Sequence, residues 1–173
     1  MFADWLEILA TVPASVLWLI DDSPESRAAL TAGFSAHGLA ADRLIFAQRT
    51  DPDRYRARLA LADLFLDTSP YNAGTIASDA LRMGLPLLTL QGKAFSARMA
   101  SSLLTAVGLP QGIASSRAEY VEKAIAFAAS PAALAPLKAR LAAGAWQATL
   151  GDTAAFTRRL EAALVSVCKR RHA

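Results

Sequence analysis

The chain has 173 residues, a net charge of +3 and a hydrophobic content of 54%. This length and composition favour one globular domain with a buried core and exclude an intrinsically disordered protein. No apolar run approaches the ~20 residues that cross a bilayer, and the single Cys168 excludes a disulfide framework. The first residues include Asp4 and Glu7, which a secretory signal would lack, so we expect a cytoplasmic protein without a membrane partner.

Short continuous apolar runs alternate with segments of helical periodicity along the first two thirds of the chain. The expected strands are residues 15–20, 43–46, 63–67 and 87–90. The expected helices are residues 3–11, 23–38, 52–62, 75–84 and 95–107, then three that begin at residues 116, 130 and 152. Strands separated by helices predict an α/β fold, with a Rossmann-like parallel sheet and helices on both faces. We expect one domain over residues 1–173, in which residues 111–173 form a purely helical extension.

The chain opens with a helix, whereas a nucleotide-binding fold normally opens with a strand. The apolar face of this helix, Trp5, Leu6 and Leu9, must be covered, and a partner lobe is one expected cover besides the domain's own sheet. The domain is therefore expected either to be part of a longer protein or to lie beside another domain.

Basic residues gather in the last third, where residues 111–173 hold nine Lys and Arg against four Asp and Glu and end in Lys169, Arg170, Arg171 and His172. A nucleic-acid surface needs such charge on one face with aromatic residues between. Most of these side chains fall on outward helix positions, so we interpret them as a solvated surface and expect no nucleic-acid partner.

Several candidate sites carry a structural alternative. No dinucleotide, P-loop or nucleophile-elbow motif is present. His37 stands at a helix end, where a cation suits the helix dipole. Asp21 and Asp22 follow the first strand as a metal or acid–base pair, or as the turn before a helix. Asp67 ends a strand and is expected either to face a ligand or to organise the loop that follows.

The segment from Asn72 to Asp79 combines several features of an anion site. A strand, a polar loop and a helix follow one another, so free N–H groups at the helix start face the carboxyl edge of the sheet. Gly74 permits close approach, Thr75 offers a hydroxyl group and a helix cap, and Asp79 can accept two hydroxyl hydrogen bonds from a ribose. The alternative is an ordinary capped helix that binds no ligand.

Several segments carry a family resemblance that runs in order along nearly the whole chain: residues 8–19, 43–46, 61–68, 71–81, 84–86, 96–98 and 100–104. With these segments the chain resembles the carboxyl-terminal half of the catalytic region of the O-GlcNAc transferase and SPINDLY-type glycosyltransferases, and of their bacterial TPR-linked relatives. The resemblance implies the second lobe of a GT-B fold, which binds UDP-GlcNAc as donor substrate for transfer to Ser or Thr of an acceptor protein, with no cofactor or obligatory metal.

The residues that the resemblance assigns to the UDP-sugar are Asp79 at the ribose, Gly74, Thr75 and Ile76 at the diphosphate, Thr50 at the uracil, and Tyr55 and Arg58 near the base and ribose. The family loop usually reads His-Thr-Thr where this chain has Gly74-Thr75-Ile76. A lysine near the base is replaced by Pro52, and a histidine is replaced by Tyr55.

In the family, a phosphate-binding lysine lies just upstream of the segment that matches residues 2–9, and an amino-terminal catalytic lobe and a TPR region supply acceptor contacts. We therefore expect the chain alone to be inactive as a transferase, with Arg49 as the nearest candidate to stabilise the departing UDP. The alternatives are a degenerate lobe that serves as a binding or interaction module without catalysis, and a response-regulator-like module built on Asp21 and Asp22.

Overall fold

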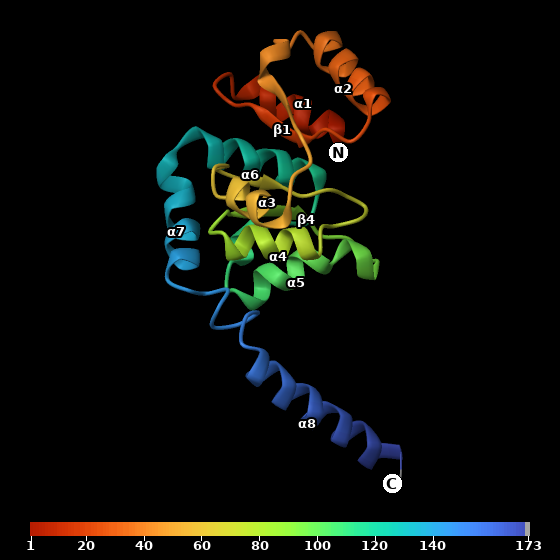
Figure 1. The fold of residues 1–173 in the computed structure, drawn as a ribbon. Coiled ribbons are helices and arrows are strands. Elements are labelled where there is room, and N and C mark those ends of the chain that lie inside the picture. The colour runs from red at the N-terminus through yellow and green to blue at the C-terminus, as the bar shows by residue number, and fades with distance from the viewer. Residues whose placement is uncertain (172–173) are drawn as a thin grey trace.

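The computed structural model describes residues 1–171, so His172 lies outside the described residues. The chain begins with helix α1 (Phe2–Thr11), followed by strand β1 (Leu17–Ile20), helix α2 (Pro24–Ala36), a short 3₁₀ turn η1 (Ala41–Arg43), strand β2 (Leu44–Ala47) and helix α3 (Pro52–Leu59). Strands β1 and β2 pair in parallel, with Leu17 opposite Leu44 and Ile20 opposite Ala47. Helices α1 and α2 with strands β1 and β2 form the upper part of Figure 1, whereas α3 lies in the lower part.

The second group holds three parallel strands in the order β3-β4-β5. Its elements are β3 (Phe65–Leu66), α4 (Thr75–Arg82), β4 (Leu87–Leu90), η2 (Phe95–Ala97), α5 (Met99–Ala106), η3 (Pro110–Gly112), β5 (Ile113–Ala114) and α6 (Arg117–Ala129). The parallel α/β fold is confirmed, although the strands pair as two separate groups rather than one sheet. The expected purely helical extension was wrong at its start, because β5 adds a strand beside β4.

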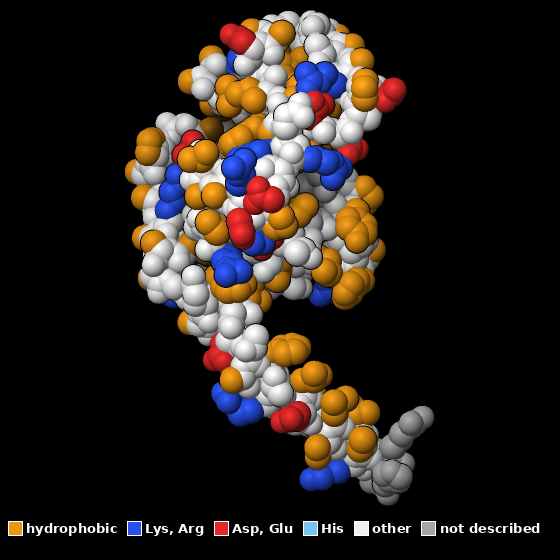
Figure 2. Space-filling model, in the orientation of Figure 1, with side chains coloured by type: hydrophobic (Ala, Val, Ile, Leu, Met, Phe, Trp, Pro, Cys, Tyr) orange, Lys and Arg blue, Asp and Glu red, His pale blue; other side chains and the backbone are white. Residues whose placement is uncertain are grey.

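The last elements are helices α7 (Pro131–Ala142) and α8 (Thr153–Arg171). Helix α7 lies along the body of the lobe, whereas α8 extends away from it (Figure 1). The expected apolar positions of α8 therefore stay exposed, and hydrophobic side chains stand along this helix in Figure 2. Among residues 1–171, no helix is both long and apolar enough to cross a membrane.

Helix starts follow the chemistry that the sequence predicts. The Ser23 hydroxyl accepts a hydrogen bond from the amide of Ser26, and Pro24 occupies the first turn of α2. At α6, the Ser116 hydroxyl accepts from the amide of Glu119 at 3.1 Å. His37 ends α2, where its Nδ1 lies 2.9 Å from the Gly33 carbonyl oxygen, which agrees with the structural interpretation of this histidine.

Helix α1 packs inside the lobe, where other elements of the same chain cover its apolar face. Leu6 and Leu9 are buried in one cluster with Phe34, and the half-buried Trp5 packs against the same cluster. Ile8 belongs to the neighbouring cluster around Tyr120 of α6. Of the two expected covers, the domain's own elements provide it: Leu17 of β1, Leu44 of β2 and Phe34 of α2 in the first cluster, and α6 in the second.

Candidate functional site

The carboxyl ends of β3, β4 and β5 share one edge, because the three strands are parallel. Asp67 follows β3, Gln91 follows β4 and Ser115 follows β5. In open parallel sheets, ligands bind outside this edge. The loop between β3 and α4 and the loop between β4 and α5 both start here, so the candidate site is built on two loops held by one small sheet.

Asp67 organises the first of these loops. Its side chain is fully buried, and Oδ1 accepts hydrogen bonds from the amides of Thr68 and Ala73, each at 2.8 Å. Its other oxygen accepts from the Thr89 hydroxyl at 2.6 Å. Burial raises the pKa of the Asp67 carboxyl group, although these hydrogen bonds oppose the rise. Of the two roles expected for Asp67, the structure therefore supports the organisation of the loop.

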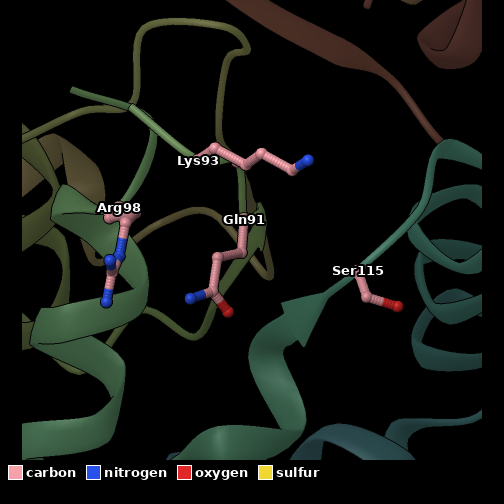
Figure 3. Close-up of a pocket in the computed structure, with 5 residues that line it drawn as sticks. Gln91, Lys93, Arg98 and Ser115 are labelled. Carbon is pink, nitrogen blue, oxygen red and sulfur yellow. The ribbon is translucent and has the colours of Figure 1, made fainter. Parts of the chain in front are cut away.

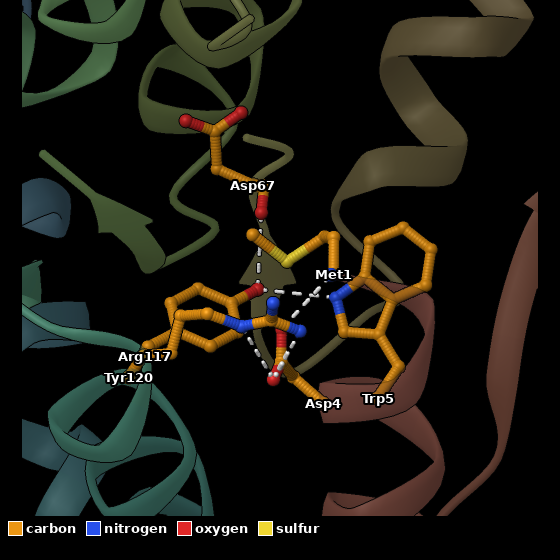
Figure 4. A network of polar contacts seen from close by, with 6 residues as sticks. All are labelled: Met1, Asp4, Trp5, Asp67, Arg117 and Tyr120. Atoms are coloured by element: carbon orange, nitrogen blue, oxygen red, sulfur yellow. Dashed lines mark hydrogen bonds and ion pairs between the residues drawn. The ribbon is translucent and has the colours of Figure 1, made fainter. Parts of the chain in front are cut away.

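The main chain of Asp67 is held by a second set of contacts, drawn in Figure 4. The Tyr120 hydroxyl donates to the Asp67 carbonyl oxygen at 3.0 Å and accepts from Trp5 Nε1 at 3.2 Å. Next to this contact, Arg117 of α6 pairs with Asp4 of α1 at 3.0 Å. Helices α1 and α6 thus fix the point at which the loop leaves β3.

Asn72 connects the two loops of the site. Its side-chain amide donates to the carbonyl oxygen of Thr68 at 2.8 Å, and its main-chain N–H donates to the carbonyl oxygen of Ser96 at 2.9 Å. The side chain is fully buried, yet its Oδ1 accepts no hydrogen bond among the described residues. The loop that ends at Gly74 is therefore anchored at both ends, by Asp67 and by Asn72.

Helix α4 begins after this loop with free N–H groups. Its N-cap is Gly74, and no side chain caps it among the described residues, so the expected capping role of Thr75 was wrong. Thr75 and Ile76 are both exposed, the latter at 46%. An uncapped helix start carries partial positive charge and unpaired amide donors, which suit an anion.

Helices α3 and α4 bring three of the predicted residues together. Burial raises the pKa of the Tyr55 hydroxyl, the negative charge of Asp79 adds to this rise, and the positive charge of Arg58 opposes it. All three side chains are half-buried. The Arg58 guanidinium donates to the Gln48 carbonyl oxygen at 2.9 Å and lies 5.9 Å from the centre of the Trp18 ring. These residues form one cluster between the two helices.

Thr50 lies directly before α3, and its hydroxyl donates to a carboxylate oxygen of Asp51 at 3.3 Å. Asp51 is the N-cap of α3 and accepts from the amides of Asp53 and Arg54. Thr50 is therefore placed at the start of the helix that carries Tyr55. No hydrogen bond joins Thr50 to the α4 start in the part of the chain that the structure describes.

Arg49 and the two carboxylates after β1 all take part in ion pairs. Asp22 forms an exposed ion pair with Arg49, and Asp21 forms one with Arg27 and also accepts from Gln48. Such pairs support the interpretation of Asp21 and Asp22 as the turn before α2. They also weaken Arg49 as the cation of the site, because its charge already has a carboxylate partner.

A hollow of about 520 Å³ opens at the carboxyl ends of β4 and β5, beside the two loops. Five residues line it: Gln91, Gly92, Lys93, Arg98 and Ser115. Figure 3 shows the four labelled side chains on different sides of this space. None of these residues was a predicted site residue. The one available signal was the polar run that follows a buried strand at Gln91.

Comparison with known proteins identifies close similarities over most of the chain. A model of glycosyl transferase family 41 matches residues 1–160. The chain is 34% identical over 158 residues to a probable UDP-N-acetylglucosamine–peptide N-acetylglucosaminyltransferase, SEC, of Arabidopsis thaliana. It is 30% identical over 166 residues to the UDP-N-acetylglucosamine–peptide N-acetylglucosaminyltransferase of Caenorhabditis elegans. A solved structure of a mutant Thermobaculum terrenum O-GlcNAc transferase superposes with a TM-score of 0.87 at 30% identity.

The matches cover most of this chain but a small part of the relatives. They include 91% and 96% of this chain, against 16% of the Arabidopsis protein and 14% of the Caenorhabditis protein. The structural match covers 94% of this chain and 32% of the Thermobaculum chain. The similarity therefore concerns one lobe of these larger proteins.

Proposed function

Because the chain belongs to glycosyltransferase family 41, we propose that it is the lobe that binds a UDP-sugar, such as UDP-N-acetylglucosamine, in a protein O-glycosyltransferase. The observation that carries this proposal is the uncapped start of α4, which stands at the carboxyl edge of a parallel sheet on a loop fixed by buried hydrogen bonds. The two curated relatives are named as transferases of N-acetylglucosamine from its UDP derivative to peptide.

In this proposal, the amides of Gly74, Thr75 and Ile76 bind the diphosphate through hydrogen bonds and the helix dipole. Asp79 lies one turn further along α4 and accepts hydrogen bonds from the two ribose hydroxyls. The position of Asp79 next to Tyr55 and Arg58 supports a nucleoside at this place, because the aromatic ring and the guanidinium offer a surface for a flat base. Thr50 stands at the outer end of α3, where the uracil would meet main-chain groups.

We propose that sugar transfer needs residues beyond this lobe. Transfer to a protein hydroxyl requires positive charge at the departing UDP and a group that orients the acceptor. An amino-terminal catalytic lobe and a TPR region would supply acceptor contacts in a longer protein. The lobe alone would bind UDP without catalysing transfer.

The alternative of a non-catalytic binding module is favoured by one observation, the exposed apolar side chain of Ile76 at the start of α4. At this position Ile76 offers only its amide to a phosphate, so the loop has fewer donors than a transferase loop with hydroxyl groups. Under this alternative the lobe keeps the fold without measurable affinity for UDP.

Calorimetric titration of the wild-type protein and of Asp79→Ala with UDP separates the two functions. Loss of hydrogen bonds to a charged group costs about 1.5–3 kcal/mol, so Asp79→Ala should weaken binding by about 10- to 150-fold. Asp63→Ala is the matched control, because Asp63 is an exposed carboxylate that pairs with Lys138 before β3. An unchanged Kd in a folded Asp79→Ala variant, or no binding to the wild type, would contradict the proposal.

A further inference from the structure

Lys93 and Arg98 differ from the other basic side chains of the lobe. Between residues 1 and 152, every other Lys or Arg contacts a carboxylate, a main-chain carbonyl oxygen or an aromatic ring. These are Arg27, Arg49, Arg54, Arg56, Arg117, Lys123 and Lys138 on carboxylates, Arg43, Arg58 and Arg140 on carbonyl oxygens, and Arg82 on the ring of Trp146. Within that range, the described contacts give the side chains of Lys93 and Arg98 no such partner.

Both unpaired cations line the same hollow, and no carboxylate lines it with them (Figure 3). One acid contacts the Ser115 wall: the Glu119 carboxylate accepts from the amide and hydroxyl of Ser115 and pairs with Lys123. Glu119 is therefore neutralised by its own lysine. The hollow consequently has an uncompensated positive charge at the edge of the sheet where ligands bind.

The loop that carries the two cations is ordered and touches the candidate diphosphate loop. The amide of Gly92 donates to the Ala97 carbonyl oxygen at 2.8 Å, and a Cβ on Gly92 would lie only 2.7 Å from the Cβ of Ala97. Gly92 therefore permits a tight loop. The hydrogen bond from Asn72 to Ser96 then joins this loop to the one that leads into α4.

We propose that Lys93 and Arg98 form an anion subsite that takes phosphate oxygens, distinct from the amides at the start of α4. Arg98 supplies a planar fork of donors and Lys93 a mobile point charge, which together suit an oxyanion. Gln91 offers a side-chain amide on another wall, whereas the amide and hydroxyl of Ser115 already donate to Glu119. Within the proposed function, the subsite supplies the positive charge that Arg49, paired with Asp22, does not bring.

The phosphate has two conceivable sources, the diphosphate of the UDP-sugar or a separate phosphate group, and three probes distinguish them. Inorganic pyrophosphate, UDP and uridine are titrated into the wild-type protein and into Lys93→Met/Arg98→Met. The control is Lys138→Met/Arg158→Met, which removes the same charge from two positions outside the hollow, the half-buried Lys138 and the exposed Arg158. Affinity is measured by calorimetry, and the place of binding by amide chemical shifts.

Pyrophosphate should bind the wild type with shifts centred on residues 91–98 and bind the first double variant about tenfold or more weakly, because two charge-assisted contacts are lost. The control should bind like the wild type. If UDP also weakens while uridine does not, the donor diphosphate is the source. If UDP affinity is unchanged and phosphate binds together with UDP, a separate phosphate group is the source.

Equal pyrophosphate affinity in the two double variants, or no pyrophosphate binding to the wild type, would overturn the subsite. The proposed function can fail independently, because a wild type that binds pyrophosphate in the hollow but does not bind UDP would retain the subsite and refute the UDP-sugar lobe. Thermal melting of each variant confirms that the lobe is folded during the titrations.

Discussion

Replacement of Asp67 by alanine tests whether one buried carboxylate fixes the candidate loop. Asp67→Ala removes the acceptor of three hydrogen bonds, from the amides of Thr68 and Ala73 and from the Thr89 hydroxyl. Thr89 and Asp67 are both fully buried, so water does not readily replace the lost partner. The change therefore leaves buried donors unpaired as well as a cavity.

The expected cost follows from these contacts. Hydrogen bonds to a charged group contribute about 1.5–3 kcal/mol each, so three of them would sum to about 5–9 kcal/mol. The variant also avoids the cost of burying the Asp67 carboxylate, the same burial that raises its pKa, and this offsets part of the loss. We expect a decrease of about 3–5 kcal/mol in the free energy of unfolding, a large share of the about 5–15 kcal/mol that holds a domain together.

Asp67→Asn is the matched control. Its amide oxygen can still accept from the two main-chain amides, and its amino group can donate to the Thr89 hydroxyl, which turns from donor to acceptor. We expect this variant to lose about 1 kcal/mol or less. Urea unfolding of the three proteins at pH 7 provides the measurement. If Asp67→Ala costs no more than Asp67→Asn, the carboxylate does not organise the loop.

The difference in stability between the wild type and Asp67→Asn should also depend on pH, with a sign that follows from the pKa of Asp67. Burial raises the folded-state pKa of Asp67 above its ordinary value of 3.8, so the folded protein holds this proton to a higher pH than the unfolded chain. Its contribution to stability is complete below that ordinary value and is lost as the pH rises through the folded-state pKa. The stability of the wild type relative to Asp67→Asn should therefore fall as the pH rises from about 4. A difference that grows with pH would refute the assigned direction.

Three further predictions concern the same lobe. Tyr120→Phe leaves the Asp67 carbonyl oxygen and Trp5 Nε1 without their shared partner. We expect the free energy of unfolding in urea to fall by about 1–3 kcal/mol and hydrogen exchange at the amides of the loop after β3 to become faster. Unchanged exchange would refute the link between Tyr120 and this loop. Gly74→His with Ile76→Thr should tighten UDP binding by about 1–3 kcal/mol, since Ile76 is exposed and a Cβ at position 74 meets only the flexible end of Met99. Calorimetry together with thermal melting tests this. The chain alone should release no UDP from UDP-N-acetylglucosamine in a coupled assay. Sustained turnover would contradict the proposal that sugar transfer needs residues beyond this lobe.

Local signals explain how much of the fold could be predicted from the sequence. Apolar runs predicted β1, β2 and β4 to within about two residues, and the helix starts expected at residues 23, 116 and 130 agree with α2, α6 and α7. β5 was missed because two residues, Ile113 and Ala114, form no recognisable period. The separation into two strand groups was also missed, because pairing depends on contacts that no local pattern contains.

The candidate site was predictable where neighbours in the sequence determine it. The order of strand, loop and helix around Asp67 to Asp79 predicts an anion site, and the structure contains this order of elements. The role of Asp67 was undecided because its deciding partner, Thr89, lies 22 positions away. The ion pair of Arg49 was not predictable for the same reason, since its partner Asp22 lies 27 positions away. The hollow of Lys93 and Arg98 could not be predicted from the sequence, because the fold determines which cations have no partner.

The contacts of α1 have a consequence for how the chain is made. Trp5 bonds to Tyr120, and Asp4 pairs with Arg117, across 115 and 113 positions of sequence. During synthesis on the ribosome, the first helix therefore emerges long before the surface on which it rests. The part of its buried face that rests on α6, with Ile8, stays exposed until α6 has been translated. We expect this interval to be the time at which a nascent chain is most exposed to aggregation and most in need of a chaperone.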